Sequence, residues 1–289
     1  MSLLGSRLFL VGPGRAGSSL ARSWTAAGGA LAGVAARTAS SAEAAARRLG
    51  AEDSCATEGH ARIEADVIAV SVPDDRIAEV AREIAPRAAA RFAFHLSGAF
   101  PADELAPLRR AGAALGALHP LGVFTGAPGE SWTGAFVAVE GDPEAVAEAE
   151  RIVRALGGRP HRLDRAAKPL YHAAAAIAAG GTAALVSVAV SLWRQAGLPE
   201  SEARPALARL SRGAAEAAET QPLDQALTGP VARRDLRTVA SHAAALREIP
   251  AAAAIYSLLA EVILRETAGR GNEEKIREAL PRDLRDREP

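Results

Sequence analysis

The chain has little cysteine, the residue whose disulfides stabilise many small secreted proteins. Among its 289 residues there is one cysteine, Cys55, so no disulfide can form within the chain. Residues 1–7 do not resemble the start of a secretory signal peptide, and these absences together favour a reducing, cytoplasmic location. The six histidines fall in none of the spacings that are typical of zinc sites, so no metal is expected.

Charge of one sign is not in excess either. The 34 basic residues balance the 34 acidic residues, and the formal net charge is zero. A basic surface that would hold the phosphates of a nucleic acid or an anionic membrane is therefore not expected. This balance leaves small molecules as the expected ligands.

One uncharged stretch, Pro169–Trp193, could be mistaken for a membrane span. It carries no Asp, Glu, Lys or Arg and is about as long as the ~20 residues that a bilayer requires. It consists mainly of Ala, Gly, Ser, Thr and Val rather than Leu, Ile and Phe, and it holds Tyr171 and His172. Because helices that are apolar all round occur in protein cores as well as in membranes, we predict a buried central helix in a soluble helical domain.

A glycine-rich turn organises the start of the chain. The apolar run that begins at Leu8 leads directly into three glycines with the spacing of a dinucleotide-binding motif. In that motif the first glycine makes a sharp turn, the second admits a pyrophosphate, and the third lets the following helix pack against the strand. The anion binds the unpaired N–H groups and the positive dipole end of that helix. The predicted cofactor contacts are therefore Gly12, Pro13, Gly14, Arg15, Ala16 and Gly17.

Strand-like and helix-like segments alternate through the first half of the chain, which is the pattern of a parallel sheet with helices on both faces. From Ala166 onward the pattern is helical only. We predict an α/β fold in which a Rossmann-type, mostly parallel sheet occupies residues 1–164 and an all-α domain occupies residues 165–289. The strands expected after the first are Ala30–Ala36, a weak Ser54–Ala56, Asp66–Val72, Phe92–Leu96, Ala114–Leu118, Ala135–Glu140 and Arg159–Leu163; the helices expected between them are Ser18–Ala27, Ser41–Leu49, Asp75–Ile84, Pro101–Gly112 and Pro143–Leu156.

The end of the second predicted strand bears on the choice of nicotinamide cofactor. A carboxylate there would bind the ribose hydroxyls of NAD, whereas an arginine accommodates the 2′-phosphate of NADP. This chain has Arg37 and Thr38, followed by Ser40 and Ser41, and no Asp or Glu. The sequence therefore favours NADP(H), the alternative being that Arg37 is only a solvated surface charge. Ser40 or Ser41 is expected to cap the helix that follows.

Later strand ends supply the rest of the expected ligand crevice, because open α/β sheets bind ligands beyond the carboxyl ends of their strands. Small or turn-forming residues follow two of the predicted strands, and an ordinary turn would explain either group as well. A histidine before a proline follows a third strand and is held extended, which suits a catalytic role or a packing role equally. The residues concerned are Ser71, Val72, Pro73, Ser97 and Gly98 for the cofactor, and His119 for catalysis.

Two groups in the helical half are candidates for substrate chemistry. Lys168, Tyr171 and His172 stand at i, i+3 and i+4 and so share one helix face, where each is a possible proton donor. The alternative is that Lys168 lies on the surface and His172 is a satisfied core histidine.

The second group lies in a predicted turn between helices. Thr228 and Gly229 offer a hydroxyl and an N–H to a substrate, and Arg233 offers a partner for a carboxylate or phosphate. The alternative there is a local structural role, in which Asp235 caps the next helix and engages Arg233.

Several of these motifs together resemble a bacterial family of NADP oxidoreductases that pairs a Rossmann domain with a helical domain of unknown function. The resemblance rests on the glycine turn, Arg37-Thr38, the SVPD, HLSG and HPL strand ends, and the segments KPLYHA and LTGPVARRD, and it extends to about Leu264. The family is related to pyrroline-5-carboxylate reductase, deazaflavin-dependent NADP reductase and the 6-phosphogluconate dehydrogenase group. The resemblance implies a 6-phosphogluconate-dehydrogenase-like helical domain, NADP(H) as cofactor and a homodimer formed through the helical domain.

The same resemblance ranks the proton donors. A lysine in 6-phosphogluconate-type dehydrogenases occupies a similar place at the start of the long central helix, so Lys168 is the first choice and His172 the second. One position departs from the family, which usually has Asn where this chain has Gly180, followed by Gly181. This departure removes a possible substrate or cofactor contact, unless the paired glycines instead let another helix approach closely.

Two functions follow from these observations. The favoured one is an NADP(H)-dependent oxidoreductase that transfers hydride to or from a small carbonyl, imine or acid at the crevice between the two domains. The alternative is a non-catalytic NADP(H)-binding sensor or scaffold, which the missing Asn would suit. Whether a deazaflavin replaces an organic substrate as hydride partner is left open.

Overall fold

The computed structural model describes residues 2–127 and 129–281. The chain forms two compact units that divide between Ala179 and Gly180. The last strand of the first unit ends at Arg162, and the first turns of the helix that follows, at Lys168 and Tyr171, make hydrogen bonds within that unit. The end of the predicted helical domain, residues 282–289, lies outside the described residues.

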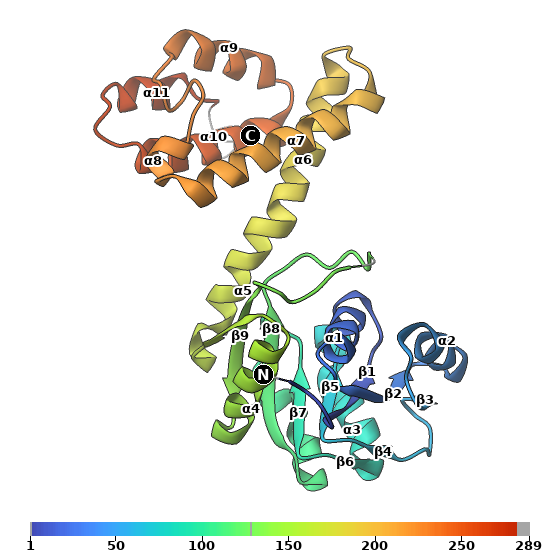
Figure 1. Cartoon of the computed structure of the whole chain (residues 1–289). Coiled ribbons are helices and arrows are strands. Elements are labelled where there is room, and N and C mark those ends of the chain that lie inside the picture. The colour runs from blue at the N-terminus through green and yellow to red at the C-terminus, as the bar shows by residue number, and fades with distance from the viewer. Residues whose placement is uncertain (1, 128, 282–289) are drawn as a thin grey trace, which may run out of the picture. The chain divides into compact units, whose positions relative to one another are not determined.

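The first unit is built on an eight-stranded sheet (Figure 1). Strand β8 pairs antiparallel with β9, β10 runs parallel to β9, and every other pair in this sheet is parallel, which confirms the predicted mostly parallel fold. In spatial order the strands are β10 (Arg159–Arg162), β9 (Phe136–Gly141), β8 (Ala114–Pro120), β7 (Phe92–His95), β5 (Val67–Val70), β1 (Arg7–Val11), β2 (Ala30–Ala36) and β3 (Ser54–Ala56). A separate two-stranded sheet joins β4 (Ile63–Glu64) to β6 (Ala88–Ala89).

Helices cover both faces of the large sheet because its strands are apolar on both sides. Leu8 and Leu10 of β1 face a core that includes residues of α1 (Arg15–Ala26), α2 (Ala39–Leu49) and α4 (Pro143–Ala155). Phe9 and Val11 of the same strand face a second core, which includes residues of α3 (Ile77–Ile84). The 3₁₀ segments of this unit are Asp74–Arg76, Ala85–Arg87, Ala102–Ala111 and Arg165–Ala167.

The helix predicted from Pro101 to Gly112 is present over Ala102–Ala111 and has 3₁₀ geometry, which suits Pro107 because it has no N–H to donate to an α-helical bond. One local expectation in this unit is wrong. Helix α2 begins earlier than expected, at Ala39, so its cap is Thr38 rather than Ser40 or Ser41. The Thr38 hydroxyl accepts a hydrogen bond from the Ser41 N–H.

The second unit is helical, as predicted. After α5 (Lys168–Ala176) and a π-helical turn over Ile177–Gly181, the helices are α6 (Thr182–Gln195), α7 (Glu200–Thr220), α8 (Leu223–Ala226), α9 (Leu236–Leu246), α10 (Pro250–Glu266) and α11 (Glu273–Ala279). Buried Arg234 has a left-handed backbone with φ of 59°. Its guanidinium donates to backbone carbonyls of Val231, Thr267 and Gly271, so it holds the turn before α9 to the end of α10.

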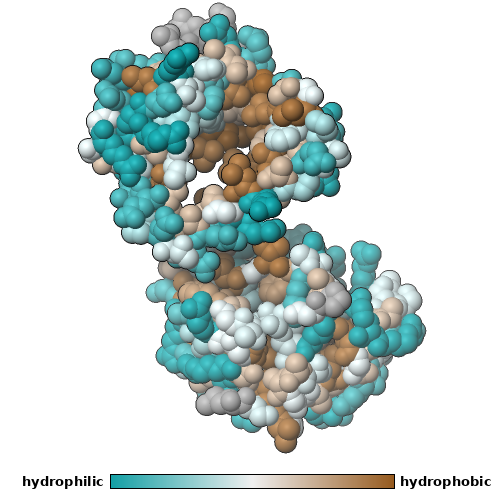
Figure 2. Space-filling view, turned by 45° about the horizontal axis from the view of Figure 1, so that its top comes forward, coloured by the Kyte–Doolittle hydropathy of each residue, from teal (hydrophilic) through white to brown (hydrophobic). Residues whose placement is uncertain are grey.

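The uncharged helix is not buried within the single chain, which contradicts the expectation for Pro169–Trp193. The helical run Arg165–Gln195 has a window of mean hydropathy 1.9, none of which is buried, and by length and composition it qualifies as a possible membrane span. Other segments of the chain cover only part of its surface. Figure 2 also shows apolar side chains on the surface of the helical unit, where exposed residues include Leu210, Leu258 and Leu259.

Candidate functional site

The glycine turn after β1 lies directly against the end of β5. A Cβ atom at Gly12 would stand 2.4 Å from the Ser71 carbonyl oxygen, and one at Gly17 would stand 2.6 Å from the Gly12 oxygen. Gly12 also has φ of 90°, a conformation that side chains disfavour. A Cβ at Gly14 meets nothing within 4 Å. The turn is therefore closed at its two ends and open at its centre.

The open centre leads into the amino end of α1. Gly14 is the N-cap residue and provides no side-chain hydrogen bond, and the first turn, with Arg15 and Ala16, has no acidic residue. The first N–H groups of this helix have no partners within the helix, and the helix dipole is positive at this end. This geometry fits the phosphates of a dinucleotide.

An arginine that sequence reasoning missed braces the glycine turn. Arg48, near the end of α2, donates through Nη2 to the Pro13 carbonyl at 3.3 Å and to the Ser18 hydroxyl at 3.2 Å. The Ser18 hydroxyl donates to the same carbonyl at 3.0 Å. Only the packing of α2 beside α1 brings Arg48 to this turn, so no local sequence pattern signals it.

The candidate specificity residues follow β2. Arg37 is exposed, and within the described ranges it forms no hydrogen bond or ion pair. Beside it, the Thr38 hydroxyl bonds the Ser41 hydroxyl at 2.8 Å and lies 3.3 Å from that of Ser40. A free guanidinium, three hydroxyls and the amino end of α2 stand together here, which suits a phosphate monoester.

The two predicted turns at the carboxyl edge of the sheet contact different parts of the site. Ser71 and Val72, which precede Pro73, lie against the glycine turn. Gly98, after β7, lies against two imidazoles: a Cβ there would be 2.6 Å from His172 Nδ1 and 2.8 Å from His119 Nδ1. Since β5 and β7 are neighbouring strands, the glycine turn and the imidazoles share one edge of the sheet.

Three candidate catalytic side chains form one cluster. His119 Nδ1 lies 2.9 Å from the Tyr171 hydroxyl, and the ring centroids of His119 and His172 are 5.5 Å apart. Phe136 also stacks on Tyr171, with ring centroids 6.3 Å apart. The three side chains line a cavity of about 630 Å³, whose other walls are residues 121–123 and alanines of residues 174–179. No hydrogen bond to His172 Nδ1, which is buried, comes from any described residue.

Lys168 lies beneath this cluster and does not line the cavity. Its side chain is 2% exposed, and Nζ stands 3.4 Å from the Ser97 carbonyl oxygen and 3.7 Å from Glu140 Oε2. The alternative of a surface lysine is therefore wrong. Burial lowers the pKa of Lys168, and the Glu140 carboxylate opposes that shift. Glu140 also accepts from the Ala102 N–H at 3.0 Å, and its role was missed because it ends a strand far from Lys168 in sequence.

Burial keeps two histidines of this region neutral. The Ser97 N–H donates to His95 Nδ1, and His95 Nε2 lies 2.9 Å from the Pro101 carbonyl oxygen, which fixes the tautomer with hydrogen on Nε2. Burial is the main cause that lowers the pKa of both His95 and His119 from 6.5 to about 4. Burial also raises the pKa of Tyr171. At neutral pH Tyr171 carries its proton and His119 is an uncharged partner.

The predicted substrate residues of the second unit lie in the turn between α8 and α9. Gly229 has φ of 94°, and its carbonyl accepts from the N–H of Arg233, an exposed residue; Thr228 precedes it. Asp235 caps α9 by accepting from the Thr238 N–H at 3.1 Å, so the predicted capping role is confirmed.

Gly180 lies in the π-helical turn, a feature frequent at functional sites. A Cβ there would meet nothing within 4 Å, so no other helix of the described chain approaches it closely.

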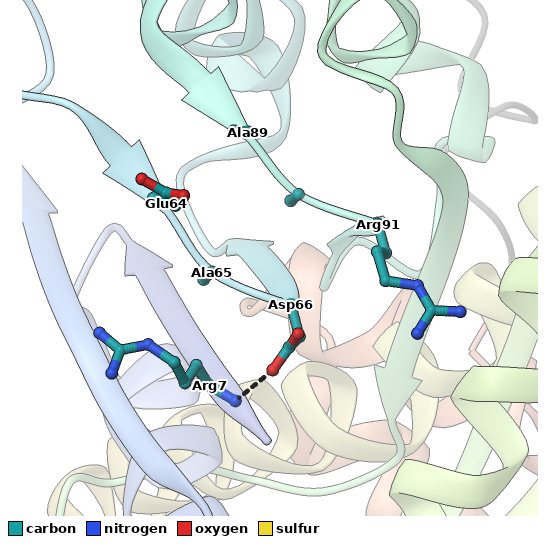
Figure 3. Close-up of a pocket in the computed structure, with 7 residues that line it drawn as sticks. Arg7, Glu64, Ala65, Asp66, Ala89 and Arg91 are labelled. Atoms are coloured by element: carbon teal, nitrogen blue, oxygen red, sulfur yellow. Dashed lines mark hydrogen bonds between the residues drawn. The ribbon is translucent and has the colours of Figure 1, made fainter. Parts of the chain in front are cut away.

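A second cavity, of about 550 Å³, lies at the opposite edge of the sheet (Figure 3). The residues that line it lie at or just before the starts of strands, including β1, β5 and β7. The Arg7 N–H donates to the Asp66 carboxylate there at 2.9 Å. Its two arginines, Arg7 and Arg91, are matched by two carboxylates, Glu64 and Asp66. Because ligands of open α/β sheets bind at the carboxyl edge, this cavity is not the candidate site. The described residues also hold no group of three His, Cys, Asp or Glu side chains placed to bind a metal ion.

Comparison with known proteins supports this architecture. Residues 5–120 match a Rossmann-like domain, and residues 135–263 match a domain of unknown function, DUF2520. The chain thus matches a Rossmann-like domain followed by a DUF2520 domain, and the predicted resemblance to proteins with a Rossmann domain followed by a helical domain of unknown function is confirmed. No curated protein sequence matches.

Solved structures show the same fold at low sequence identity. A Bacteroides fragilis protein provisionally named an NADP oxidoreductase is 22% identical, with a TM-score of 0.73 over 90% of this chain and 98% of that one. A Thermotoga maritima protein is also 22% identical, with a TM-score of 0.70 over 90% and 98%. An imine reductase from Myxococcus stipitatus, in complex with NADP⁺, is 19% identical, with a TM-score of 0.61 over 95% and 99%.

The neutral state of His95 predicts a fold that loses stability in acid. The pKa of His95 is about 4 in the folded chain, compared with the ordinary value of 6.5 for histidine. As the pH falls from 6.5 to 4, this histidine therefore takes up a proton in the unfolded chain before it does so in the folded chain. The contribution of neutral His95 to the free energy of unfolding is therefore fully present above pH 6.5. Up to about 3 kcal/mol of it is lost as the pH falls to 4. Urea unfolding at pH 7, 5.5 and 4.5 measures the slope.

The matched variants are His95→Gln and His60→Gln, the latter at an exposed histidine. The first is expected to make the pH dependence shallower, with buried His119 contributing part of what remains, and the second is the control for the substitution itself. An equal slope in His95→Gln and the unmodified protein would contradict the assignment.

Proposed function

We propose that this protein is an NADP(H)-dependent oxidoreductase that transfers hydride to or from a small carbonyl, imine or acid substrate. The observation that carries the proposal is that the glycine turn and the cluster of His119, Tyr171 and His172 meet neighbouring strand ends, through Ser71 and Gly98 respectively. A dinucleotide that begins at one contact and ends at the other would bring its reactive ring beside the proton donors.

Support for NADP(H) comes from residues and from relatives. Arg37 and the hydroxyls beside it suit the 2′-phosphate, and Gly14 leaves room for the pyrophosphate. The Myxococcus stipitatus imine reductase and a Plasmodium falciparum pyrroline carboxylate reductase, 12% identical with a TM-score of 0.57 over 95% of this chain and 99% of that one, both hold NADP in their structures. When bound, the cofactor supplies or accepts a hydride at its nicotinamide ring.

Proton transfer is assigned to the side chains that line the cavity. Hydride addition to a C=O or C=N carbon places an electron pair on oxygen or nitrogen, which must then gain a proton. The Tyr171 hydroxyl lines the cavity and is bonded to neutral His119, so Tyr171 replaces Lys168 as our first choice of donor, with His172 next. Lys168 is then a positioning residue. Its ammonium group contacts the Ser97 carbonyl, and the Glu140 carboxylate compensates its positive charge.

A non-catalytic NADP(H)-binding sensor is the second candidate, and the specific observation that favours it is Gly180, which provides no side chain where the resembling family has Asn. Consumption of NADPH with a panel of small ketones, imines, keto acids and deazaflavin separates the two functions. The sensor binds NADPH and consumes none.

Replacement of Arg37 by Glu tests the cofactor preference. The variant Arg37→Glu is expected to weaken NADPH binding by about 100-fold and NADH binding by less than about threefold, because only NADPH carries the phosphate that Arg37 would contact. Fluorescence titration measures both dissociation constants. Equal losses for the two cofactors would remove Arg37 from the 2′-phosphate site.

Replacement of Tyr171 by Phe tests the proton donor. The variant Tyr171→Phe keeps the ring but loses the hydroxyl, so kcat is expected to fall about 10²–10⁴-fold while the Kd for NADPH is unchanged. Tyr256→Phe is the matched control, because Tyr256 also bonds a histidine, His242, at 3.0 Å but lies in the second unit. A kcat unchanged in Tyr171→Phe would exclude it as the donor.

We further propose a cytoplasmic homodimer in which a second copy covers the uncharged helix. The helix is unburied in the single chain, and its small residues allow close approach of another helix. A bilayer is a poorer occupant, because Tyr171 and His172 of the same helix belong to the polar cluster.

The dimer predicts a solution mass of about twice the 29.7 kDa of one chain in light scattering. Ile177→Glu places a charge on the helix at a residue that is 74% exposed, whereas Leu4→Glu does so at one that is 83% exposed and lies elsewhere. Only the first is expected to yield monomers. A monomeric unmodified protein would contradict the proposal.

A further inference from the structure

We infer that the cavity beside Tyr171 selects an uncharged, largely apolar ketone or imine and disfavours substrates that carry a carboxylate or phosphate. This inference rests on the proposed function and narrows it, because the proposal above admits acids as well as neutral carbonyl compounds.

The lining of the cavity is polar at one end only. His119, Tyr171 and His172 form that end, and the remaining walls are Leu121, Gly122, Val123 and alanines of residues 174–179. Among the described residues of the single chain that line the cavity, none is Asp, Glu, Lys or Arg. The volume of about 630 Å³ lies within the range of small-molecule sites, which have apolar walls and a few convergent polar groups.

The polar end offers hydrogen bonds to a ligand. The Tyr171 hydroxyl has one partner, His119, and can donate to a carbonyl oxygen or an imine nitrogen. His172 Nδ1 is buried with no hydrogen-bond partner in residues 2–127 or 129–281. A buried ring nitrogen without a partner is costly, and a polar atom of a ligand would satisfy it.

The cationic groups of the neighbourhood do not serve an anionic ligand. Lys168 is the only charged residue of α5, but it is 2% exposed and its ammonium faces the Ser97 carbonyl and Glu140. His119 has a pKa of about 4, with burial as the main cause, so it is uncharged at neutral pH.

These features make the binding of an anion in the cavity unfavourable. A carboxylate that enters these apolar walls loses its hydration and finds no opposite charge in exchange. A neutral carbonyl or imine loses less hydration and keeps a hydrogen bond at the polar end. The selectivity therefore comes from the absence of a cation in the lining rather than from a specific attraction.

The test uses binding, so that it does not depend on turnover. The chain has two tyrosines, so incorporation of 3-fluorotyrosine gives two ¹⁹F signals, which Tyr171→Phe assigns. Cyclohexanone and 4-oxocyclohexanecarboxylate, which differ by one carboxylate, are titrated at pH 7.5 into the full-length protein without added cofactor, because the oxidised nicotinamide of NADP⁺ would itself place a positive charge beside the cavity. The Tyr171 signal is expected to shift with a Kd at least about tenfold lower for cyclohexanone, while the Tyr256 signal stays in place.

A charge inserted into the lining provides the converse test. Val123 is 72% exposed, so Val123→Arg adds a cation without disturbing the core. Compared with Val123→Gln, the neutral control, it is expected to lower the Kd of the carboxylate compound at least about tenfold, with no comparable gain for cyclohexanone.

Three results would overturn the inference: equal or tighter binding of the carboxylate compound in the unmodified protein, no shift with either compound, or no gain of carboxylate binding in Val123→Arg. The proposed function is judged separately by consumption of NADPH. A protein that binds cyclohexanone selectively but consumes no NADPH refutes the proposed function alone.

Discussion

The close contact between the glycine turn and the end of β5 is the constraint on which the rest of the site depends. With no Cβ at Gly12 or Gly17, the turn after β1 approaches Ser71 so closely that any side chain there would collide with backbone. This approach lets α1 start beside the sheet with its amino end uncapped. The same edge carries the β7 turn at Gly98, and so the imidazoles stand beside the place where a dinucleotide would end.

Burial governs the chemistry of the second half of the site. His95 and His119 are neutral at pH 7 chiefly because they are removed from water. Lys168 is buried with a carboxylate, Glu140, within ion-pair distance, which limits the cost of its charge. The polar end of the cavity therefore combines hydrogen-bonding side chains with described lining residues that include no Asp, Glu, Lys or Arg. This combination underlies both the proposed role of Tyr171 and the inferred preference for neutral substrates.

Much of the fold could be predicted from the sequence because its signals are local. The glycine spacing, the apolar runs and the shared helix face of Lys168, Tyr171 and His172 each lie within a few residues. The second strand, Ala30–Ala36, was predicted with the bounds that the structure has. Long-range features could not be predicted: Arg48 on the Pro13 carbonyl and Glu140 beside Lys168 depend on packing between segments far apart in the chain. The exposure of the uncharged helix was missed because composition shows that a surface is apolar but not what covers it.

The central claim, that a phosphate-bearing dinucleotide binds at the glycine turn, is tested most directly by calorimetric titration of NADP⁺ into the protein and into its Gly14→Ala variant. A Cβ at Gly14 meets nothing in the chain itself, so the variant should keep its fold and lose only the space that the pyrophosphate needs. The account predicts saturable binding to the unmodified protein and binding at least about tenfold weaker in the variant. Absence of heat with the unmodified protein at millimolar NADP⁺, or equal affinity in the two proteins, would contradict it.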